Sequence, residues 1–185
     1  MKRLVKWLLV AVLLLAVAFF AGAYVLPGEI SAQRSIDIAA PPDRIFAVVG
    51  DLRRGKEFSP WAEIDPNTQY DFDKSEPGIG QTMRWHSTHQ EVGTGSMIVT
   101  EYEPDHHMAS ALDLGDMGRA TTSFDLVPVS GGGTIVTWGF KAALSNPLER
   151  WMCVFLDFDS LIGKDYEKGL AKLKTLLESQ QPNSP

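Results

Sequence analysis

The sequence predicts an α+β fold, with an apolar N-terminal segment, an antiparallel sheet and one long C-terminal helix. Three observations predict it: residues 8–26 carry no charge, the middle of the chain repeatedly alternates apolar and polar residues, and after Pro147 the apolar residues recur with the period of a helix. Helices segregated to one side of an antiparallel sheet define this class. The 185 residues divide into a segment of 1–26, one domain of 27–178 and a tail of 179–185.

The N-terminal segment is long enough to cross a membrane. A bilayer core requires about 20 apolar residues, and residues 8–26 supply them behind three basic residues within the first six positions. Trp7 and Tyr24 stand where interfacial aromatic residues belong. The Ala-Gly-Ala of residues 21–23 also resembles a processing site, so a cleaved signal peptide is the alternative.

The charge distribution around this segment predicts its orientation. Basic residues before an apolar run favour a cytoplasmic N-terminus. We therefore expect a single-pass protein of a bacterial inner membrane, whose membrane contact is residues 8–26. The domain would then lie on the periplasmic or other extracytoplasmic side.

The domain begins with a strand and a short helix. Residues 29–38 alternate between apolar and polar, as in a strand with one wet face. Pro41 and Pro42 end this strand, and the following apolar residues predict a short helix that stops at Gly50. Residues 51–66 are expected to form an irregular segment of helix and loop.

Six further strands are predicted, which brings the sheet to about seven. They fall near residues 70–72, 83–85, 93–103, 108–114, 120–128 and 135–140. Turn residues separate them, and Gly131-Gly132-Gly133 between the last two strands marks the clearest hairpin of the chain.

A single helix of about 30 residues is predicted for the C-terminal part, about 45 Å long at 1.5 Å per residue. That is more than a small core needs unless a sheet curls along it. The polar residues after Ser179 predict a frayed tail. The stripe of the helix comprises Trp151, Met152, Phe155, Asp159, Ile162, Tyr166, Leu170, Leu173 and Leu177.

Charge and motif content exclude several classes of function. Three of the 17 basic residues precede residue 27, which leaves 14 against 23 acidic residues in the rest of the chain. Without a Lys/Arg stripe, so acidic a domain is not expected to bind nucleic acid. Cys153, the only cysteine, allows neither an intramolecular disulfide nor a cysteine-based zinc site. No dinucleotide, phosphate-loop or nucleophile-elbow motif occurs, so no cofactor is expected.

Four histidines form two pairs, His86 with His89 and His106 with His107. The predicted strand between them has about 12 residues at about 3.3 Å each, so its ends lie nearly 40 Å apart. Each pair alone lacks a third ligand, and no metal site is expected.

In this order, these segments resemble the START/Bet v 1-like superfamily, also called SRPBCC, and within it the bacterial polyketide cyclase/dehydrase-like branch. The likeness covers residues 29–177. The motifs that carry it are Arg34-Ser35-Ile36, Ala40-Pro41-Pro42, Ile45-Phe46, Phe58-Ser59-Pro60-Trp61, Asp65-Pro66, Gly78-Ile79-Gly80, Trp85, Gly93-Thr94-Gly95-Ser96-Met97, Glu101, Pro104, Gly133-Thr134, Val136-Thr137-Trp138, Gly163-Lys164-Asp165-Tyr166-Glu167-Lys168-Gly169-Leu170 and Leu173-Lys174.

The resemblance implies a helix-grip fold, in which a curved sheet and a long helix enclose an elongated hydrophobic cavity. Families with this fold bind lipids, sterols, polyketides or plant hormones, and a few members are cyclases or dehydratases. Because a fold does not imply one function, we expect a non-enzymatic, membrane-tethered domain that binds a lipid, a polyketide-like or a quinone-like molecule. The expected cavity lining, each member of which could instead fill the core, is Trp61, Met83, Trp85, Met97, Phe124, Trp138, Met152, Phe155 and Asp159.

The alternative is a cyclase or dehydratase that acts on a polyketide-like substrate, with Asp159 or His86 as acid or base. Asp159 falls on the predicted apolar stripe, and burial there would raise its pKa. The simpler interpretation pairs Asp159 with Arg84, Arg150 or a backbone group.

Overall fold

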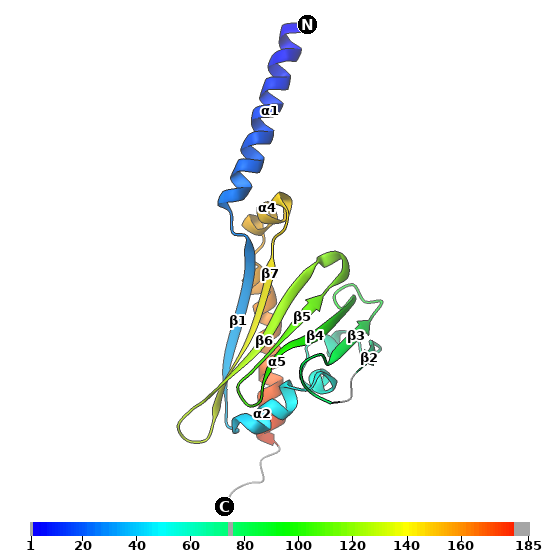
Figure 1. Ribbon diagram of the computed structural model, residues 1–185, viewed down its shortest axis with the longest axis vertical. Helices are drawn as coiled ribbons and strands as arrows, with labels where there is room; N and C mark the ends of the chain where they lie inside the picture. The colour runs from blue at the N-terminus through cyan, green and yellow to red at the C-terminus, as the bar shows by residue number, and fades with distance from the viewer. Residues whose placement is uncertain (1, 74–75, 180–185) are drawn as a thin grey trace, which may run out of the picture.

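The computed structural model describes residues 2–73 and 76–179. The tail predicted for residues 179–185 therefore lies outside the described residues from position 180 onward. Helix α1, Lys2–Val25, projects from the domain as a rod that contacts the domain near its C-terminal end (Figure 1). It is long and apolar enough to cross a membrane, although a signal sequence can have the same properties. Three residues, 26–28, connect α1 to the first strand.

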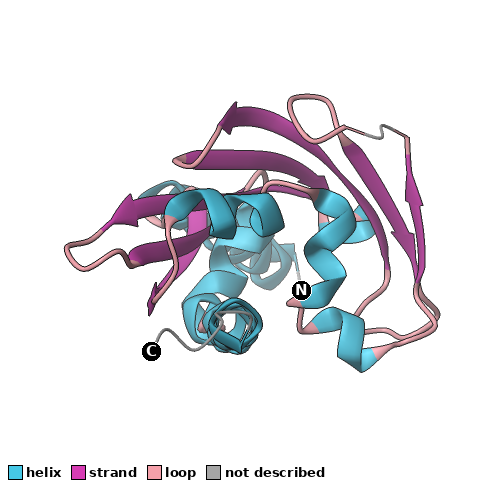
Figure 2. Cartoon of the chain, turned by 90° about the horizontal axis from the view of Figure 1, so that it is seen from below, coloured by secondary structure: helices cyan, strands magenta, loops and turns pink. Residues whose placement is uncertain are grey.

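The sheet contains seven antiparallel strands, as predicted. Their order in the sheet is β1-β7-β6-β5-β4-β3-β2. The first strand pairs with the last along its full length, from Glu29 opposite Ala143 to Ile38 opposite Thr134. Figure 2 shows the sheet curving around the helices. The strands are β1 Glu29–Ile38, β2 Gln69–Phe72, β3 Thr82–His86, β4 Thr94–Glu103, β5 His107–Asp113, β6 Arg119–Pro128 and β7 Thr134–Ala143.

Short helices connect β1 to β2 and β5 to β6. They are α2 Pro42–Val49, the 3₁₀ helix η1 Leu52–Glu57, α3 Trp61–Ile64 and the 3₁₀ helix η2 Gly115–Met117. Helix α2 ends before Gly50, as predicted, and buries its apolar face. Asp51 caps η1, because its Oδ1 accepts a hydrogen bond from the backbone N of Arg53 at 3.0 Å. The same oxygen accepts one from the buried amide of Gln81 at 2.9 Å, which ties η1 to the start of β3.

The C-terminal helix is divided in two, so the prediction of one continuous helix is wrong. Helix α4 covers Pro147–Phe155 and α5 covers Phe158–Ser179. Between them Leu156 is extended, and Asp157 accepts hydrogen bonds from the backbone N of Ser160 at 3.1 Å and from its hydroxyl at 2.6 Å. An aspartate just before the first residue of a helix accepts hydrogen bonds from the free N–H groups of its first turn. The periodicity of the apolar residues continued through this cap and concealed it.

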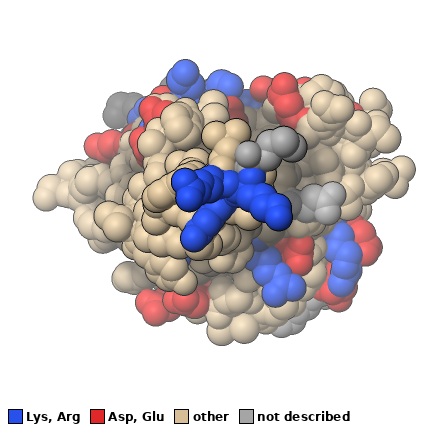
Figure 3. Space-filling view, turned by 90° about the horizontal axis from the view of Figure 1, so that it is seen from above, with Lys and Arg blue, Asp and Glu red and all other residues tan. Residues whose placement is uncertain are grey.

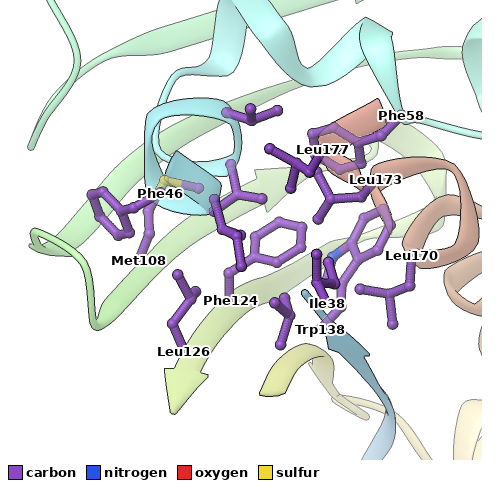
Figure 4. Packing of buried hydrophobic residues seen from close by; sticks show 14 of the residues in the cluster. Ile38, Phe46, Phe58, Met108, Phe124, Leu126, Trp138, Leu170, Leu173 and Leu177 are labelled. Atoms are coloured by element: carbon purple, nitrogen blue, oxygen red, sulfur yellow. The ribbon is translucent and has the colours of Figure 1, made fainter. Parts of the chain in front are cut away.

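Helix α5 lies on the concave side of the sheet, against β1 and β7. Its buried leucines, Leu170, Leu173 and Leu177, meet Phe124 and Trp138 from the sheet in one core (Figure 4). Gly169 allows this close approach, since a β-carbon there would come within 2.5 Å of the Trp138 ring. The sheet and helix are therefore in direct contact at this end of the concave face.

Candidate functional site

The concave face of β2 to β4 carries a continuous apolar surface that is only partly covered. Met83 lies opposite Met97, and Phe72 of β2 lies opposite Met83 on the same face. All three pack against the edge of the core but stay half-buried. Trp85 shares this face by strand alternation, is half-buried, and donates its indole N–H to the carbonyl of Val92 at 3.2 Å. Three of the predicted lining residues, Met83, Trp85 and Met97, therefore share this surface.

Phe124 and Trp138 belong to the closed part of the core. Their rings stack with centroids 4.9 Å apart, and Trp138 stacks on Tyr166 at 4.1 Å. Trp61 meets Trp138 and Tyr166 edge-on at 6.2 and 6.3 Å and remains half-buried. Trp61 thus packs at the edge of the closed aromatic cluster.

A group of hydroxyl side chains interrupts the apolar surface of the concave face on β5 and β6. Thr122 accepts the indole N–H of Trp138 at 2.9 Å, and its hydroxyl lies 3.3 Å from that of Tyr166. Burial raises the pKa of Tyr166, so its hydroxyl stays neutral. Ser110, directly opposite Thr122 and fully buried, has the one buried side-chain oxygen or nitrogen of the described residues that lacks a hydrogen-bond partner.

Met152 and Phe155 do not face the interior, which corrects their predicted place beside the other lining residues. Both lie on α4, with 48% and 81% of their surface exposed. The reason is the break at Leu156, which ends α4 before the chain reaches the concave face. The stripe of the predicted helix therefore belongs to two helices with different surroundings.

Asp159 is also placed differently from the prediction. Its side chain is half exposed, and its carboxylate accepts hydrogen bonds from Arg34 at 3.0 and 3.1 Å. Arg34 also donates to Glu167 at 2.8 Å. The hydrogen bond from Arg34 lowers the pKa of Asp159, opposite to the rise expected from burial. Its partner is Arg34, and neither Arg84 nor Arg150.

His86, the other candidate acid or base, points away from the interior. It alternates with Trp85 on β3, so it lies on the convex face, where its Nδ1 is 2.7 Å from the hydroxyl of Thr94. It borders a shallow hollow of about 550 Å³ together with Arg84, Ser96 and Asp113. Across the described part of the chain, no three His, Cys, Asp or Glu side chains gather as metal ligands would.

A second hollow lies between the start of β1 and the junction of α4 with α5. Its volume is about 380 Å³. Its walls combine apolar residues such as Ile30, Leu156 and Phe158 with the acidic residues Glu29, Asp157 and Asp159. Phe155 and Asp159, predicted to line an interior cavity, line this hollow instead. The full lining is Pro27, Glu29, Ile30, Ser31, Cys153, Val154, Phe155, Leu156, Asp157, Phe158 and Asp159.

Sequence reasoning missed Ser110 as a residue of the concave face. It placed Arg34 and Thr122 on the apolar faces of their strands but assigned neither of them a role in the site. Arg34 gave a signal, because a charged residue at an apolar position of the first strand requires a polar partner. The structure supplies that partner from α5. Ser110 gave no such signal, since hydroxyl residues occur on either face of a strand.

Comparisons with known proteins agree with this architecture. The family model described as "Polyketide cyclase / dehydrase and lipid transport" matches residues 29–178. The chain is similar in structure to protein TTHA0849 from Thermus thermophilus (18% identity, TM-score 0.60), protein MLL2253 from Mesorhizobium loti (16%, 0.59) and Ara h 8.0201 (12%, 0.58). Each of these alignments covers 83% of this chain and 100% of the other. No curated protein sequence matches the chain.

At such identities the structural likeness shows the fold alone, which is the helix-grip fold. The family model also shows family membership, because it matches the chain from β1 to the end of α5. A family whose description includes lipid transport indicates that a hydrophobic ligand is bound. The chain belongs to the polyketide cyclase/dehydrase and lipid transport family, within the START/Bet v 1-like superfamily.

Proposed function

We propose that this protein is a non-enzymatic, membrane-tethered binding module for a hydrophobic small molecule such as a lipid, a polyketide-like or a quinone-like compound. The ligand lies on the concave face between β3 to β5 and the aromatic cluster. Met83, Met97, Trp85 and Trp61 contact it, and Phe124 and Trp138 form the closed end of the site. The ligand is drawn from the adjacent bilayer, where tethering keeps the domain at high local concentration.

The single observation that carries this proposal is the unpaired hydroxyl of Ser110. Buried polar groups in folded proteins nearly always have partners, and an unpaired one costs about 1–3 kcal/mol. Ser110 stands on the same face as the half-buried Met97 and Trp85, and a few polar anchors within an apolar surface are typical of small-molecule sites. A ligand oxygen would supply the missing partner when the side chains that cover Ser110 in the ligand-free structure move apart.

Contacts of the N-terminal helix support the tether. The candidate processing site at residues 21–23 is covered by α4: Ala23 is buried, and its carbonyl accepts a hydrogen bond from Arg150 at 3.3 Å. Removal of α1 by cleavage would expose this surface. Basic side chains gather at the free end of α1 (Figure 3), as expected for the cytoplasmic end of a membrane anchor.

Fluorescence tests the site directly. The full chain, purified in mild detergent, is titrated with cis-parinaric acid, a fluorescent long-chain fatty acid that accepts energy from tryptophan. We expect Met97→Trp to fill the concave surface and to weaken binding at least about tenfold, equivalent to about 1.4 kcal/mol. Ile98→Trp, one residue along β4 on the convex face, is the matched control and should bind as the parent does.

Two results would contradict the proposal. One is a parent chain that binds no probe and, in native mass spectrometry after mild extraction, carries no apolar molecule. The other is equal binding by the two tryptophan variants, which would place the ligand away from the concave face.

A further inference from the structure

Helix α4 presents an apolar face that no described residue covers. Leu148, Met152 and Phe155 recur on it at helical spacing, with 62%, 48% and 81% of their surface exposed. The two charged residues of α4 lie off this face. Glu149 is engaged in the capping box with Asn146, and Arg150 binds the carbonyl of Ala23. One side of α4 is therefore held by the protein while the other is apolar and bare.

The covered side of α4 is attached to the membrane helix. The ring of Trp151 stacks on that of Phe19, with centroids 5.9 Å apart, and its indole N–H donates to the carbonyl of Phe19 at 3.1 Å. Gly22 permits this approach, because a β-carbon there would lie 2.7 Å from the Trp151 ring. Figure 1 shows α4 beside the domain end of α1.

The attachment point sets the depth of α4. Phe19 lies six residues before Val25, the last residue of α1, which is about 9 Å along the helix axis. An amphipathic helix at a membrane interface immerses its apolar face by about 5–10 Å. If residues 8–26 cross the hydrocarbon core, Trp151 contacts α1 at the depth where such a helix would lie.

We propose that α4 is an interfacial helix, whose face of Leu148, Met152 and Phe155 is immersed in the outer surface of the bilayer that α1 crosses. This inference rests on the proposed tether and adds a second membrane contact to it. The occupant of the bare face is lipid. Leu156 and Phe158 continue the apolar surface into the 380 Å³ hollow, which then opens at the level of the lipid.

The test uses the full chain in vesicles of phosphatidylcholine and phosphatidylglycerol. Cys153→Ser removes the native thiol, and Phe155→Cys introduces a single site for an environment-sensitive nitrobenzoxadiazole label. Lipids with a nitroxide on the acyl chain should quench this label at least about twofold, as for a group at the acyl boundary. The matched control carries the label through Ser130→Cys in the β6–β7 turn, at the end of the sheet away from α1, and should not be quenched.

Extraction with alkaline carbonate separates this inference from the tether. A chain that resists extraction but whose Phe155→Cys label is not quenched would overturn the interfacial helix and leave the tether intact. A blue-shifted label without quenching would mean that protein, such as a second copy of the chain, covers α4, and would also overturn it. A chain that is extracted would refute both. Leu148→Cys provides a second labelling site should Phe155→Cys fold poorly.

Discussion

Ser110 shows what one hydroxyl without a partner implies at a buried position. Its neighbours on the concave face, Val99 and Thr122, leave its oxygen unpaired. Thr122 avoids this state because its hydroxyl donates to the carbonyl of Gly139 at 3.0 Å and accepts from Trp138. The unpaired oxygen should therefore destabilise the ligand-free protein and favour a ligand that can bond to it.

Replacing this hydroxyl should change stability and binding in opposite directions. We expect Ser110→Ala to raise the free energy of unfolding of the ligand-free chain by about 1 kcal/mol, because no buried group is left unsatisfied. Thermal unfolding of the full chain in detergent measures this change. Binding of cis-parinaric acid should weaken in the same variant if its carboxyl group reaches this position.

Ser123→Ala is the matched control for this prediction. Ser123 lies on β6 beside Thr122 but points to the other face, so neither stability nor binding should change by a comparable amount. A destabilised Ser110→Ala variant would show that the hydroxyl has a partner in solution and would contradict its assignment to the site.

At the scale of elements, Arg34 connects β1 to α5, directly opposite Trp138 of β7. It donates to Asp159 at the start of α5 and to Glu167 two turns later. The pKa of Asp159 is lowered chiefly by the hydrogen bond from Arg34, and Arg34 itself stays charged over the whole range of pH. A carboxyl group whose pKa is lower in the folded than in the unfolded chain stabilises the fold above its unfolded pKa, and this contribution is lost as pH falls.

We expect Asp159→Asn to lower the melting temperature slightly at pH 7, because the ion pair is exposed and such pairs contribute little. The difference from the parent should shrink below about pH 4, where the unfolded carboxyl group is protonated, and vanish below the folded pKa. Thermal unfolding at a series of pH values measures it. Glu91→Gln, at a position with no ion pair to any described residue, should show no such pH dependence. A gap between Asp159→Asn and the parent that persisted at low pH would contradict the electrostatic explanation.

The same elements show how far the sequence predicted the structure. Alternation in the strands and turn residues between them were sufficient for all seven strands and their order along the chain, since these signals are local. The junction of α4 and α5 was not predicted, because Phe155, Asp159 and Ile162 keep helical spacing across the Asp157 cap. For the site, alternation assigned Met83, Trp85 and Met97 to the concave face correctly. It could not distinguish half-buried residues from Phe124 and Trp138, whose burial depends on how close α5 approaches.

At the scale of the whole molecule, the proposed tether predicts the mature N-terminus. The contacts of Gly22 and Ala23 with α4 are retained only if α1 stays attached. We therefore expect the chain isolated from bacterial membranes to have the intact mass of a protein that includes residues 2–26. Mass spectrometry of the intact protein checks this. A chain that begins at Tyr24 would mean that α1 is a cleaved leader. The interfacial position of α4 would then no longer be supported, because it rests on the contact of α4 with α1.

The short connection between α1 and β1 limits how an anchored protein of this kind could exchange a bound hydrophobic ligand. Residues 26–28 span at most about 10 Å, and the carbonyl of Gly28 is fixed by the backbone N of Leu144 at 2.9 Å. A membrane-anchored domain with so short a linker cannot carry a molecule across an aqueous compartment. It would meet ligands only by diffusing laterally along its own leaflet. Transfer of a bound ligand to another membrane would require a freely diffusing acceptor protein.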